Sequence, residues 1–406
     1  MADYCLIGKR LDYSYSKVVH NKLGYDYDLT EVKEEDLGAF MRSRRYKAFN
    51  VTIPYKRAVI PYLDELSEEA AALGVVNLVR DEGGKLKGYN MDIRGMEYAL
   101  ARTGLSLAGK KVVILGTGNT SDTAAYLAGR AGASSIVKIS RSGEDNYDNL
   151  SRHADAAYLI NTTPVGTYPA NEDVLVDLAI FPRLEGVQEV IYNPFKTRLA
   201  LQAEDRGLPV ATGLDMLVGQ AAYSAELFRG TRPAAERVDE IVREILSEER
   251  NIFLIGMPSC GKSTIGRALA QRLGRPFIDV DEEIVRAHGN IPDIFRSEGE
   301  EAFRAYECEA LAEIAKGHGR VVATGGGAVE RERNILNMRQ NGVIVYLKRD
   351  LSALSDEGRP LSQGGRIGAL YERRKPLYEW AADVAVSNDG TPAEAVERIA
   401  NEVKKL

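Results

Sequence analysis

The chain has 406 residues and carries 53 Lys and Arg against 59 Asp and Glu, a net charge of −6 at pH 7. This length predicts two or three domains, because single cores stop growing near about 250–300 residues. A composition of 44% hydrophobic and 28% charged residues excludes a disordered or fibrous chain, and the acidic balance disfavours nucleic-acid binding. Without a signal peptide or an apolar run of ~18–20 residues, and with three scattered cysteines, we expect a cytoplasmic protein with reduced thiols and no membrane partner.

Short β-like runs alternate with helical patterns along most of the chain, which is typical of α/β folds with mainly parallel sheets. In chain order, strands are predicted at 47–53, 111–115, 135–139, 251–255, 321–323 and 343–347. Residues 232–250 have helical periodicity, with apolar side chains at Val238, Ile241, Val242 and Ile245. We interpret this helix as leading directly into a further domain, with the boundary near residues 248–250.

A glycine-rich turn after the strand at 111–115 predicts a dinucleotide site. It reads Gly116-Thr117-Gly118-Asn119-Thr120-Ser121 and lacks the third glycine of the full fingerprint. The N-terminus of the helix that follows would still favour a pyrophosphate. The next strand ends at Ser140-Arg141-Ser142, where an arginine favours the 2′-phosphate of NADP over the free ribose of NAD. The alternative for Arg141 is an ordinary surface arginine.

A second glycine-rich turn matches the complete phosphate-loop pattern G-x-x-x-x-G-K-[ST], between an apolar strand and a helix. Backbone N–H groups must wrap the phosphates there, which excludes side chains at the glycines. Lys262 supplies positive charge at the β- and γ-phosphates of ATP, and the Ser263 hydroxyl can bind Mg²⁺. The predicted nucleotide-binding residues are Gly256, Ser259, Cys260, Gly261, Ser263 and Thr264, with Cys260 a small loop residue and not a nucleophile.

Nearly all of residues 250–406 resemble shikimate kinase. The resemblance rests on Asp279-Val280-Asp281, Gly299-Glu300-x-x-Phe303-Arg304-x-x-Glu307, Gly325-Gly326-Gly327, Arg359-Pro360-Leu361 and Arg374-x-Pro376-Leu377-Tyr378. It implies that Asp281 holds and activates the ring hydroxyls, that Asp279 helps to bind Mg²⁺, and that Gly325, Gly326 and Gly327 let the ring approach the backbone. It also implies that Arg304 and Arg374 clamp the shikimate carboxylate, while Arg359 closes a lid over the transferring phosphoryl group.

Two alternatives remain for these residues, and one segment departs from the family pattern. Asp279 and Asp281 could be an ordinary helix N-cap pair, and Arg373, Arg374 and Lys375 could form a solvated basic face. The segment 348–358 before Arg359 is shorter than is usual in the family, which leaves the adenine contacts and the lid length open.

Residues 1–248 resemble shikimate dehydrogenase. The motifs are Ser14-Tyr15-Ser16, Asn50-Val51-Thr52-Ile53-Pro54-Tyr55-Lys56, Gly74-Val75-Val76-Asn77, Gly88-Tyr89-Asn90-Met91-Asp92, Asn161-Thr162-Thr163-Pro164-Val165-Gly166, Tyr192-Asn193-Pro194 and Gly213-x-x-Met216-Leu217-x-x-Gln220. The resemblance implies an acid–base pair of Lys56 and Asp92, because an ammonium can donate a proton while a carboxylate keeps it charged and oriented.

The same resemblance assigns the other residues of this part. It implies that Ser14 and Ser16 bind the substrate carboxylate, that Thr52, Asn77 and Gln220 contact ring hydroxyls, and that Tyr192 lies beside the substrate. The expected cofactor set is Gly116, Gly118, Asn119, Thr120, Ser140, Arg141, Ser142 and Gly213. Taken singly, Lys56 could be a solvated lysine and Asp92 a helix cap. Lys17, Leu78 and Met91 depart from the usual proline and two threonines.

The resulting prediction is a bifunctional α/β enzyme of aromatic amino-acid biosynthesis that uses NADPH, ATP and Mg²⁺. Residues 1–108 and 214–248 would form a substrate lobe, 109–213 a Rossmann-type NADP lobe, and 249–406 a P-loop kinase-type domain with a parallel sheet. The substrates implied are 3-dehydroshikimate, shikimate and ATP. The alternatives are that the first part is an NAD-dependent quinate/shikimate dehydrogenase, or a non-catalytic module attached to an active kinase.

Overall fold

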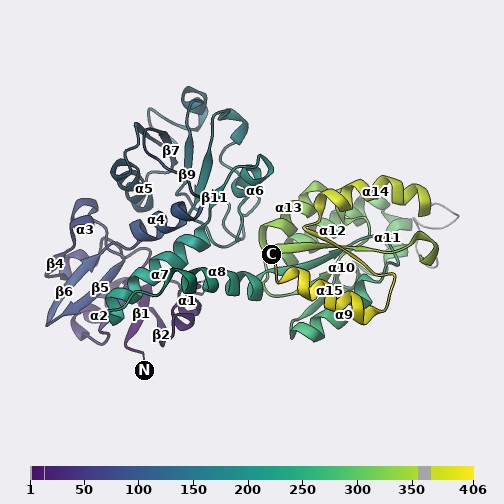
Figure 1. The fold of residues 1–406 in the computed structure, drawn as a ribbon, viewed down its shortest axis with the longest axis horizontal. Coiled ribbons are helices and arrows are strands. Elements are labelled where there is room, and N and C mark those ends of the chain that lie inside the picture. The colour runs from purple at the N-terminus through teal and green to yellow at the C-terminus, as the bar shows by residue number, and fades with distance from the viewer. Residues whose placement is uncertain (1, 13, 355–366) are drawn as a thin grey trace. The chain divides into compact units, whose positions relative to one another are not determined.

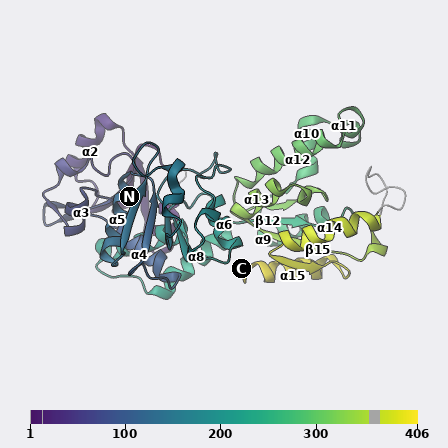
Figure 2. The same cartoon turned by 90° about the horizontal axis from the view of Figure 1, so that it is seen from above.

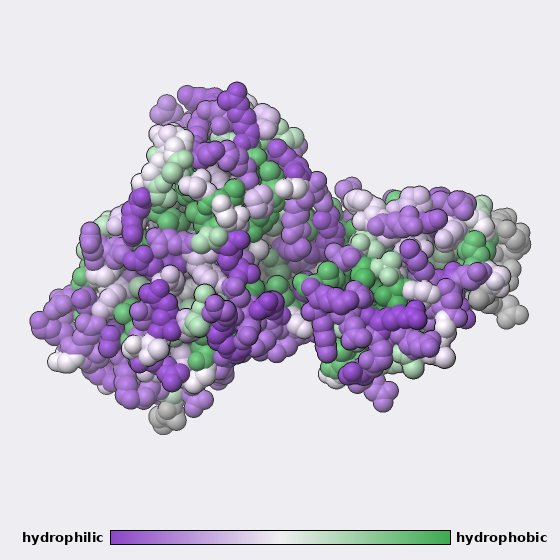
Figure 3. All heavy atoms as spheres, viewed as in Figure 1, coloured by the Kyte–Doolittle hydropathy of each residue, from purple (hydrophilic) through white to green (hydrophobic). Residues whose placement is uncertain are grey.

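The computed structural model describes residues 2–12, 14–354 and 367–406, which form two compact units (Figure 1). The first unit comprises Met1–Thr167 and Asp173–Arg243, and the second comprises Tyr168–Glu172 and Glu244–Leu406. Strands and helices alternate in both, so the predicted α/β class is confirmed. Hydrophilic side chains cover most of the face seen in Figure 3.

The N-terminal part of the first unit contains a six-stranded mixed sheet. Its order is β2 (Tyr27–Glu31), β1 (Tyr4–Gly8), β3 (Ala48–Val51), β5 (Leu78–Glu82), β6 (Lys85–Tyr89) and β4 (Glu65–Leu66). Strands β1, β2 and β3 are parallel, whereas β5 and β6 form an antiparallel hairpin that the sequence analysis did not predict. Strand β3 lies within the predicted 47–53, and Thr52 and Lys56 follow its carboxyl end.

Several α-helices and 3-10 helices accompany the sheets in the described part of the first unit. The α-helices are α1 (Ser16–Lys22), α2 (Leu37–Ser43), α3 (Glu68–Leu73), α4 (Asp92–Arg102), α5 (Asn119–Arg130), α6 (Arg198–Asp205) and α7 (Gly213–Arg229). The 3-10 helices are η1 (Glu34–Asp36), η2 (Ile60–Tyr62), η3 (Tyr147–His153) and η4 (Leu178–Ile180). Helices α4 and α7 pack against each other between the two sheets (Figure 1). This packing brings the start of α4 and the middle of α7 to the end of the first sheet.

The second sheet of the first unit is fully parallel, as predicted. Its order is β11 (Val210–Ala211), β10 (Gly186–Glu189), β9 (Tyr158–Asn161), β7 (Lys111–Leu115) and β8 (Ser135–Ile139). Strand β7 comes first in the chain but lies between β8 and β9, so the strand order reverses there. In open parallel sheets, ligands bind outside the carboxyl ends of the strands at such a switch point. The turn 116–118 occupies this position.

The second unit is built on a parallel five-stranded sheet. Its order is β13 (Phe277–Asp279), β14 (Val321–Ala323), β12 (Asn251–Ile255), β15 (Gly342–Lys348) and β16 (Val384–Ser387). The helices are α9 (Lys262–Leu273), α10 (Val280–His288), α11 (Ile291–Ser297), α12 (Glu300–Ala315), η5 (Ala328–Glu330), α13 (Glu332–Asn341), η6 (Leu351–Ala353), α14 (Ile367–Ala381) and α15 (Pro392–Val403). Helices α9 and α15 pack together, as do α12 and α13 (Figures 1 and 2). All five residues of β12 are buried, and this burial fixes the position of the turn that follows the strand.

Helix α8 (Ala235–Glu249) starts just after Pro233 and ends one residue before β12. Its four predicted apolar residues, Val238, Ile241, Val242 and Ile245, are buried.

The described cysteines, Cys5, Cys260 and Cys308, are all buried and free. Among the described residues, no helix combines the length and apolar character needed to cross a membrane.

Candidate active sites

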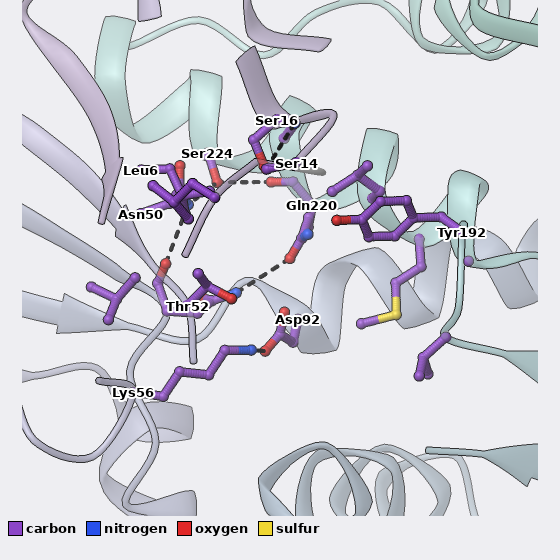
Figure 4. A pocket seen from close by; sticks show the side chains of 18 of the residues that line it. Leu6, Ser14, Ser16, Asn50, Thr52, Lys56, Asp92, Tyr192, Gln220 and Ser224 are labelled. Atoms are coloured by element: carbon purple, nitrogen blue, oxygen red, sulfur yellow. Dashed lines mark hydrogen bonds and ion pairs between the residues drawn. The ribbon is translucent and has the colours of Figure 1, made fainter. Parts of the chain in front are cut away.

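A cavity of about 440 Å³ lies in the first unit, and residues from several distant motifs line it (Figure 4). Every predicted catalytic and substrate residue of this unit is in its wall, namely Ser14, Ser16, Thr52, Lys56, Asn77, Asp92, Tyr192 and Gln220. Thr120 and Gly213 from the predicted cofactor set also line it. The cavity therefore extends from the mixed sheet toward the glycine turn.

Lys56 and Asp92 form an ion pair in this cavity. The Lys56 ammonium donates to Asp92 Oδ2 at 2.6 Å, and the two side chains are only 14% and 6% exposed. Asp92 is the first residue of α4, whose positive N-terminal end favours a carboxylate, while Met91 occupies the N-cap position. Lys56 is thus not a solvated lysine and Asp92 is not the helix cap. The pair places an ammonium directly against a carboxylate inside the cavity.

Amide side chains fix the cavity wall next to this pair. Asn77 donates to Gln220 Oε1 at 3.3 Å and accepts the backbone N–H of Met91 at 2.6 Å. Asn50, which the residue assignments above did not include, donates to the Asn77 carbonyl at 3.2 Å and to Ser224 Oγ at 3.1 Å. Asn50 therefore connects β3 to α7 and keeps the two sides of the cavity in a fixed relative position. The sequence signal that could have identified Asn50 was its position in the seven-residue motif that ends at Lys56.

Ser14 and Ser16 lie across the cavity from Lys56 (Figure 4). The backbone N–H of Ser16 donates to Ser14 Oγ at 3.3 Å, so the two residues form a tight turn. Burial raises the pKa of the Tyr192 phenol, and a hydrogen bond with Ser14 partly opposes this rise. These three hydroxyl groups make a neutral, hydrogen-bonding surface opposite the ammonium.

The three departures from the family pattern lie away from this surface. Leu78 is fully buried in an apolar cluster with Tyr27 and Phe228, and Met91 packs against the same cluster. Lys17 is exposed on α1. None of the three belongs to the described residues that line the cavity. Leu78 and Met91 thus contribute apolar packing next to the cavity where the family pattern has two threonine hydroxyls.

The glycine turn of this unit has the geometry of a phosphate-binding site. Gly116 has φ +107°, and a Cβ atom there would lie 2.9 Å from Thr162 Oγ1. A Cβ atom at Gly118 would meet no atom within 4 Å, so the space in front of α5 is open. Asn119 and Thr120 begin α5, whose N–H groups face this space. The turn therefore has room for a pyrophosphate.

Arg141 follows the strand next to this turn. The Gly116 N–H donates to the Ile139 carbonyl at 2.8 Å, which sets the ends of β7 and β8 side by side. Ser140 Oγ accepts the Gly143 N–H at 2.6 Å and shapes the loop, while Arg141 and Ser142 are exposed. An exposed guanidinium here suits either a cofactor phosphate or solvent, so both interpretations of Arg141 stay open.

Two charged residues that no motif indicated also belong to this region. Arg57 donates to Asn119 Oδ1 at 2.8 Å, to Asp122 Oδ2 at 3.1 Å and to the Gly74 carbonyl at 3.0 Å. It thereby joins the substrate lobe to the first turn of α5.

Glu189, at the end of β10, is completely buried, and burial raises its pKa to about 7. Its carboxylate accepts bonds from Asn161, Thr197 and the backbone N–H groups of 190 and 191.

The phosphate loop of the second unit surrounds the Lys262 ammonium. Gly256 has φ +144°, and a Cβ atom there would lie 2.6 Å from the Leu347 carbonyl oxygen. The buried Lys262 donates to the carbonyls of Gly256 and Met257, both at 2.9 Å. Asn388 donates to the Cys260 carbonyl at 2.8 Å and holds the loop from the β16 side. Gly261 precedes α9, and Ser263 and Thr264 are exposed in its first turn.

Ser263 and Asp279 meet at the end of the sheet. Ser263 Oγ donates to Asp279 Oδ2 at 2.5 Å, while Asp279 Oδ1 accepts the Asp281 N–H at 3.1 Å and caps α10. One oxygen of Asp279 thus caps the helix and the other faces the phosphate-loop serine. Among the described residues no group of three acidic, histidine or cysteine side chains could hold a metal. A hydroxyl and one carboxylate nevertheless fit Mg²⁺, which usually takes its other ligands from water and nucleotide phosphates.

The glycine triplet lies against the charged residues of α12. A Cβ atom at Gly325 would overlap Glu307 Oε1, and one at Gly327 would overlap Arg304 Nη2. Asp281 Oδ1 is 3.2 Å from the same Cβ position at Gly325. Gly326 lies against Pro258 of the phosphate loop and accepts the Tyr378 hydroxyl. The triplet therefore brings the phosphate loop, Asp281 and Arg304 together.

Arg304 and Arg374 are almost completely buried, with side chains 6% and 2% exposed. The interpretation of Arg374 as part of a solvated face is therefore wrong. Arg304 Nη1 donates to Glu307 Oε2 at 2.8 Å, and Arg374 Nη2 donates to Glu330 Oε2 at 2.9 Å. The predicted lid residue, Arg359, lies outside the described residues.

Comparisons with known proteins agree with this geometry. The shikimate dehydrogenase (NADP(+)) of Clostridium perfringens (strain 13 / Type A) is 32% identical over 262 residues, which cover 59% of this chain and 97% of that protein. The chain belongs to the shikimate dehydrogenase family. Family models for the shikimate dehydrogenase substrate binding domain and the shikimate 5′-dehydrogenase C-terminal domain match residues 6–79 and 213–243.

Solved structures of the shikimate dehydrogenase family share the fold. A chorismate mutase/shikimate 5-dehydrogenase fusion protein from Clostridium acetobutylicum is 30% identical, with a TM-score of 0.57, covering 60% of this chain and 97% of that chain. Shikimate 5-dehydrogenase from Thermus thermophilus, in complex with NADP(H) and shikimate, is 27% identical with a TM-score of 0.55, covering 60% and 99%. These matches confirm the predicted family of the first part.

The second part is a shikimate kinase domain, because the shikimate kinase family model matches residues 258–404. The match includes Lys262, Asp281 and the two buried arginines. This member of the shikimate dehydrogenase family therefore carries both an oxidoreductase and a kinase in one chain, as predicted.

Proposed function

We propose that the first unit reduces 3-dehydroshikimate to shikimate with NADPH, and that the second phosphorylates shikimate with ATP and Mg²⁺. The observation that carries the first activity is the buried Lys56–Asp92 pair, which faces a cavity lined by hydroxyl and amide groups. We further propose that the two enzymes divide the chain near residue 248, where α8 gives way to β12.

In the proposed reduction, NADPH supplies a hydride to the ketone carbon. The Lys56 ammonium gives a proton to the ketone oxygen as negative charge develops there, and it regains a proton from solvent. Asp92 keeps the lysine charged and oriented before the transfer. Ser14, Ser16 and Tyr192 would donate hydrogen bonds to the substrate carboxylate across the cavity. Asn77 and Gln220 would hold the ring hydroxyls, which fixes the ketone next to Lys56.

In the proposed phosphorylation, MgATP supplies the phosphoryl group. Lys262 would pair with the β- and γ-phosphates, and Ser263 with Asp279 would hold Mg²⁺. Asp281 would orient the attacking hydroxyl of shikimate and accept its proton. Arg304 and Arg374, next to the glycine triplet, would bind the substrate carboxylate. Because shikimate is the product of one unit and the substrate of the other, the two reactions would be consecutive.

A coupled assay tests both activities in the full chain. With 3-dehydroshikimate, NADPH, ATP and Mg²⁺, we expect NADPH consumption and formation of shikimate 3-phosphate. Omission of ATP should stop the reaction at shikimate, and omission of NADPH should abolish both products. If the first unit uses only NAD, or turns over only quinate, the proposed reduction is wrong. If added shikimate is not phosphorylated, the proposed kinase reaction is wrong.

A further inference from the structure

Arg304 and Arg374 share one protein carboxylate, that of Glu330. Arg374 Nη2 lies 2.9 Å from Glu330 Oε2, and Arg304 Nη2 lies 3.5 Å from the same oxygen. Glu330 is the last residue of η5, only three positions after the glycine triplet. A carboxylate of the chain itself thus occupies the point between the two guanidinium groups that are proposed to bind the substrate.

The surroundings keep the Glu330 carboxylate ionised. Burial alone would raise its pKa, but the neighbouring guanidinium groups, Arg374 foremost, outweigh burial and lower it. Arg373 adds a third contact, with its Nη2 atom 2.5 Å from Glu330 Oε1. Unlike the two buried arginines, Arg373 is 60% exposed. Glu330 is therefore paired with buried arginines through one oxygen and with a surface arginine through the other.

The Glu330 side chain also reaches the protein surface. Its side chain is 18% exposed, whereas the Glu307 side chain that holds Arg304 from the other side is fully buried. Rotation of Glu330 toward Arg373 would free Oε2 from Arg304 and Arg374 while keeping one ion pair. Glu307 would still hold Arg304 in position.

We propose that Glu330 is an internal competitor for the substrate carboxylate, which must displace it from Arg304 and Arg374 before the substrate binds. This inference rests on the proposed kinase function and makes Glu330 a residue that sets the affinity for acidic substrates. Displacement moves Glu330 onto Arg373 alone. The chain thereby binds its substrate more weakly than the same two arginines would without Glu330.

The first test is Glu330→Gln, which keeps the size of the side chain and removes its charge. The KM for shikimate should fall about tenfold, equivalent to about 1.4 kcal/mol, and the change should appear in KM more than in kcat. The KM for shikimate methyl ester, which lacks the charged carboxylate, should not fall. Glu301→Gln is the matched control, since Glu301 is an exposed acid paired with Arg331, and it should leave the shikimate KM unchanged.

The second test is Arg373→Gln, which removes the partner that receives displaced Glu330. The KM for shikimate should rise in the otherwise unchanged chain and should not rise in the Glu330→Gln background. A higher shikimate KM in Glu330→Gln would overturn the proposal, since it would mean that Glu330 organises the arginines for the substrate. An equal fall in KM for the methyl ester would also overturn it.

Calorimetric binding of shikimate without ATP separates this inference from the proposed function. The first unit is also proposed to bind shikimate, so the data are fitted with two sites, and only the kinase site should respond to Glu330→Gln. If the chain binds shikimate but does not phosphorylate it, the proposed reaction is wrong, and the dissociation constants of wild type and Glu330→Gln still decide the role of Glu330. Tighter binding to the variant would support internal competition. Equal or weaker binding, or no binding to either protein, would overturn it.

Discussion

Arg57 Nε lies 2.8 Å from Asn119 Oδ1, which links the residue after Lys56 to the first residue of α5. Lys56 follows β3 of the mixed sheet and Asn119 follows β7 of the parallel sheet, and the proposed hydride transfer requires the two ligands bound there to meet within bonding reach. The same guanidinium also contacts Asp122 and the Gly74 carbonyl. Arg57 therefore fixes the distance between the proposed proton donor, Lys56, and the glycine turn.

We expect Arg57→Ala to lower kcat/KM for reduction by about tenfold, as the loss of one or two charge-assisted hydrogen bonds would. The rate of shikimate phosphorylation should stay the same. The control is Arg232→Ala, because Arg232 is similarly exposed and pairs with Glu226 inside the first unit, away from the cavity. Steady-state kinetics with varied NADPH measure the effect. Equal losses in both variants would mean that Arg57 contributes only to stability.

The Lys56–Asp92 pair predicts a selective loss of reduction. Lys56→Ala removes the proton donor, so kcat for reduction should fall by about 10²- to 10⁴-fold, the usual contribution of general acid catalysis. Asp92→Asn keeps the shape but not the charge and should also lower kcat. Phosphorylation of added shikimate by the same preparations should be unchanged. Loss of both activities in Lys56→Ala would argue against independent sites.

The phosphate loop predicts the opposite selectivity. Lys262→Ala should reduce ATP-dependent phosphorylation by at least about 100-fold, since a preorganised charge at the transferring group contributes about 10²–10³ in rate. Reduction of 3-dehydroshikimate should continue at the normal rate. Lys316→Ala is a suitable control, because Lys316 is a lysine of the same unit that pairs with the exposed Glu313. Normal phosphorylation by Lys262→Ala would exclude Lys262 from the chemistry.

The proposed use of NADPH in place of NADH rests on Arg141. If it contacts the 2′-phosphate, Arg141→Gln should raise KM for NADPH about 10-fold or more, as expected for a lost hydrogen bond to a charged group. The KM for NADH should change little, because NADH has no 2′-phosphate. Arg152→Gln, at another exposed arginine of the same lobe, should affect neither cofactor. A wild-type preference for NADH would contradict the assignment of Arg141.

The strands and the glycine turns were predictable because they depend on local patterns. The predicted strands at 111–115, 135–139, 251–255 and 321–323 coincide with β7, β8, β12 and β14, and 343–347 lies inside β15. Residues from the predicted motifs of the first unit also line one cavity there. The β5–β6 hairpin was not predicted, because its strands are mostly polar.

The charged contacts between distant segments could not be predicted. Glu330 stands in a run of alternating acids and bases and has the appearance of a surface residue. Only the approach of α12 and α14 to the glycine triplet turns it into the partner of two buried arginines. Arg57 and Glu189 are similar cases, since the side-chain partners of each come from segments that lie apart in the chain. Such pairs depend on tertiary packing, which single-sequence patterns do not report.

Glu189 predicts how the stability of the first unit depends on pH. Burial raises its pKa from an ordinary 4.5 to about 7, so the folded protein holds the proton more tightly than the unfolded chain does. Its stabilising contribution is therefore complete below about pH 4.5 and is lost as the pH rises through about 7. The full loss is about 3 kcal/mol, of which about 2 kcal/mol falls between pH 5.5 and 8.

Glu189→Gln does not titrate, so the comparison with wild type isolates this effect. The free energy of unfolding of wild type minus that of the variant should decrease by about 2 kcal/mol from pH 5.5 to pH 8. Hydrogen exchange of residues 158–161 and 186–191, corrected for the intrinsic rate at each pH, measures it locally. Glu185→Gln removes an exposed carboxylate from the same segment, and its difference from wild type should change far less. A difference for Glu189→Gln that does not vary with pH would mean that the hydrogen-bond donors around Glu189, including Asn161 and Thr197, keep it ionised throughout this range despite its burial.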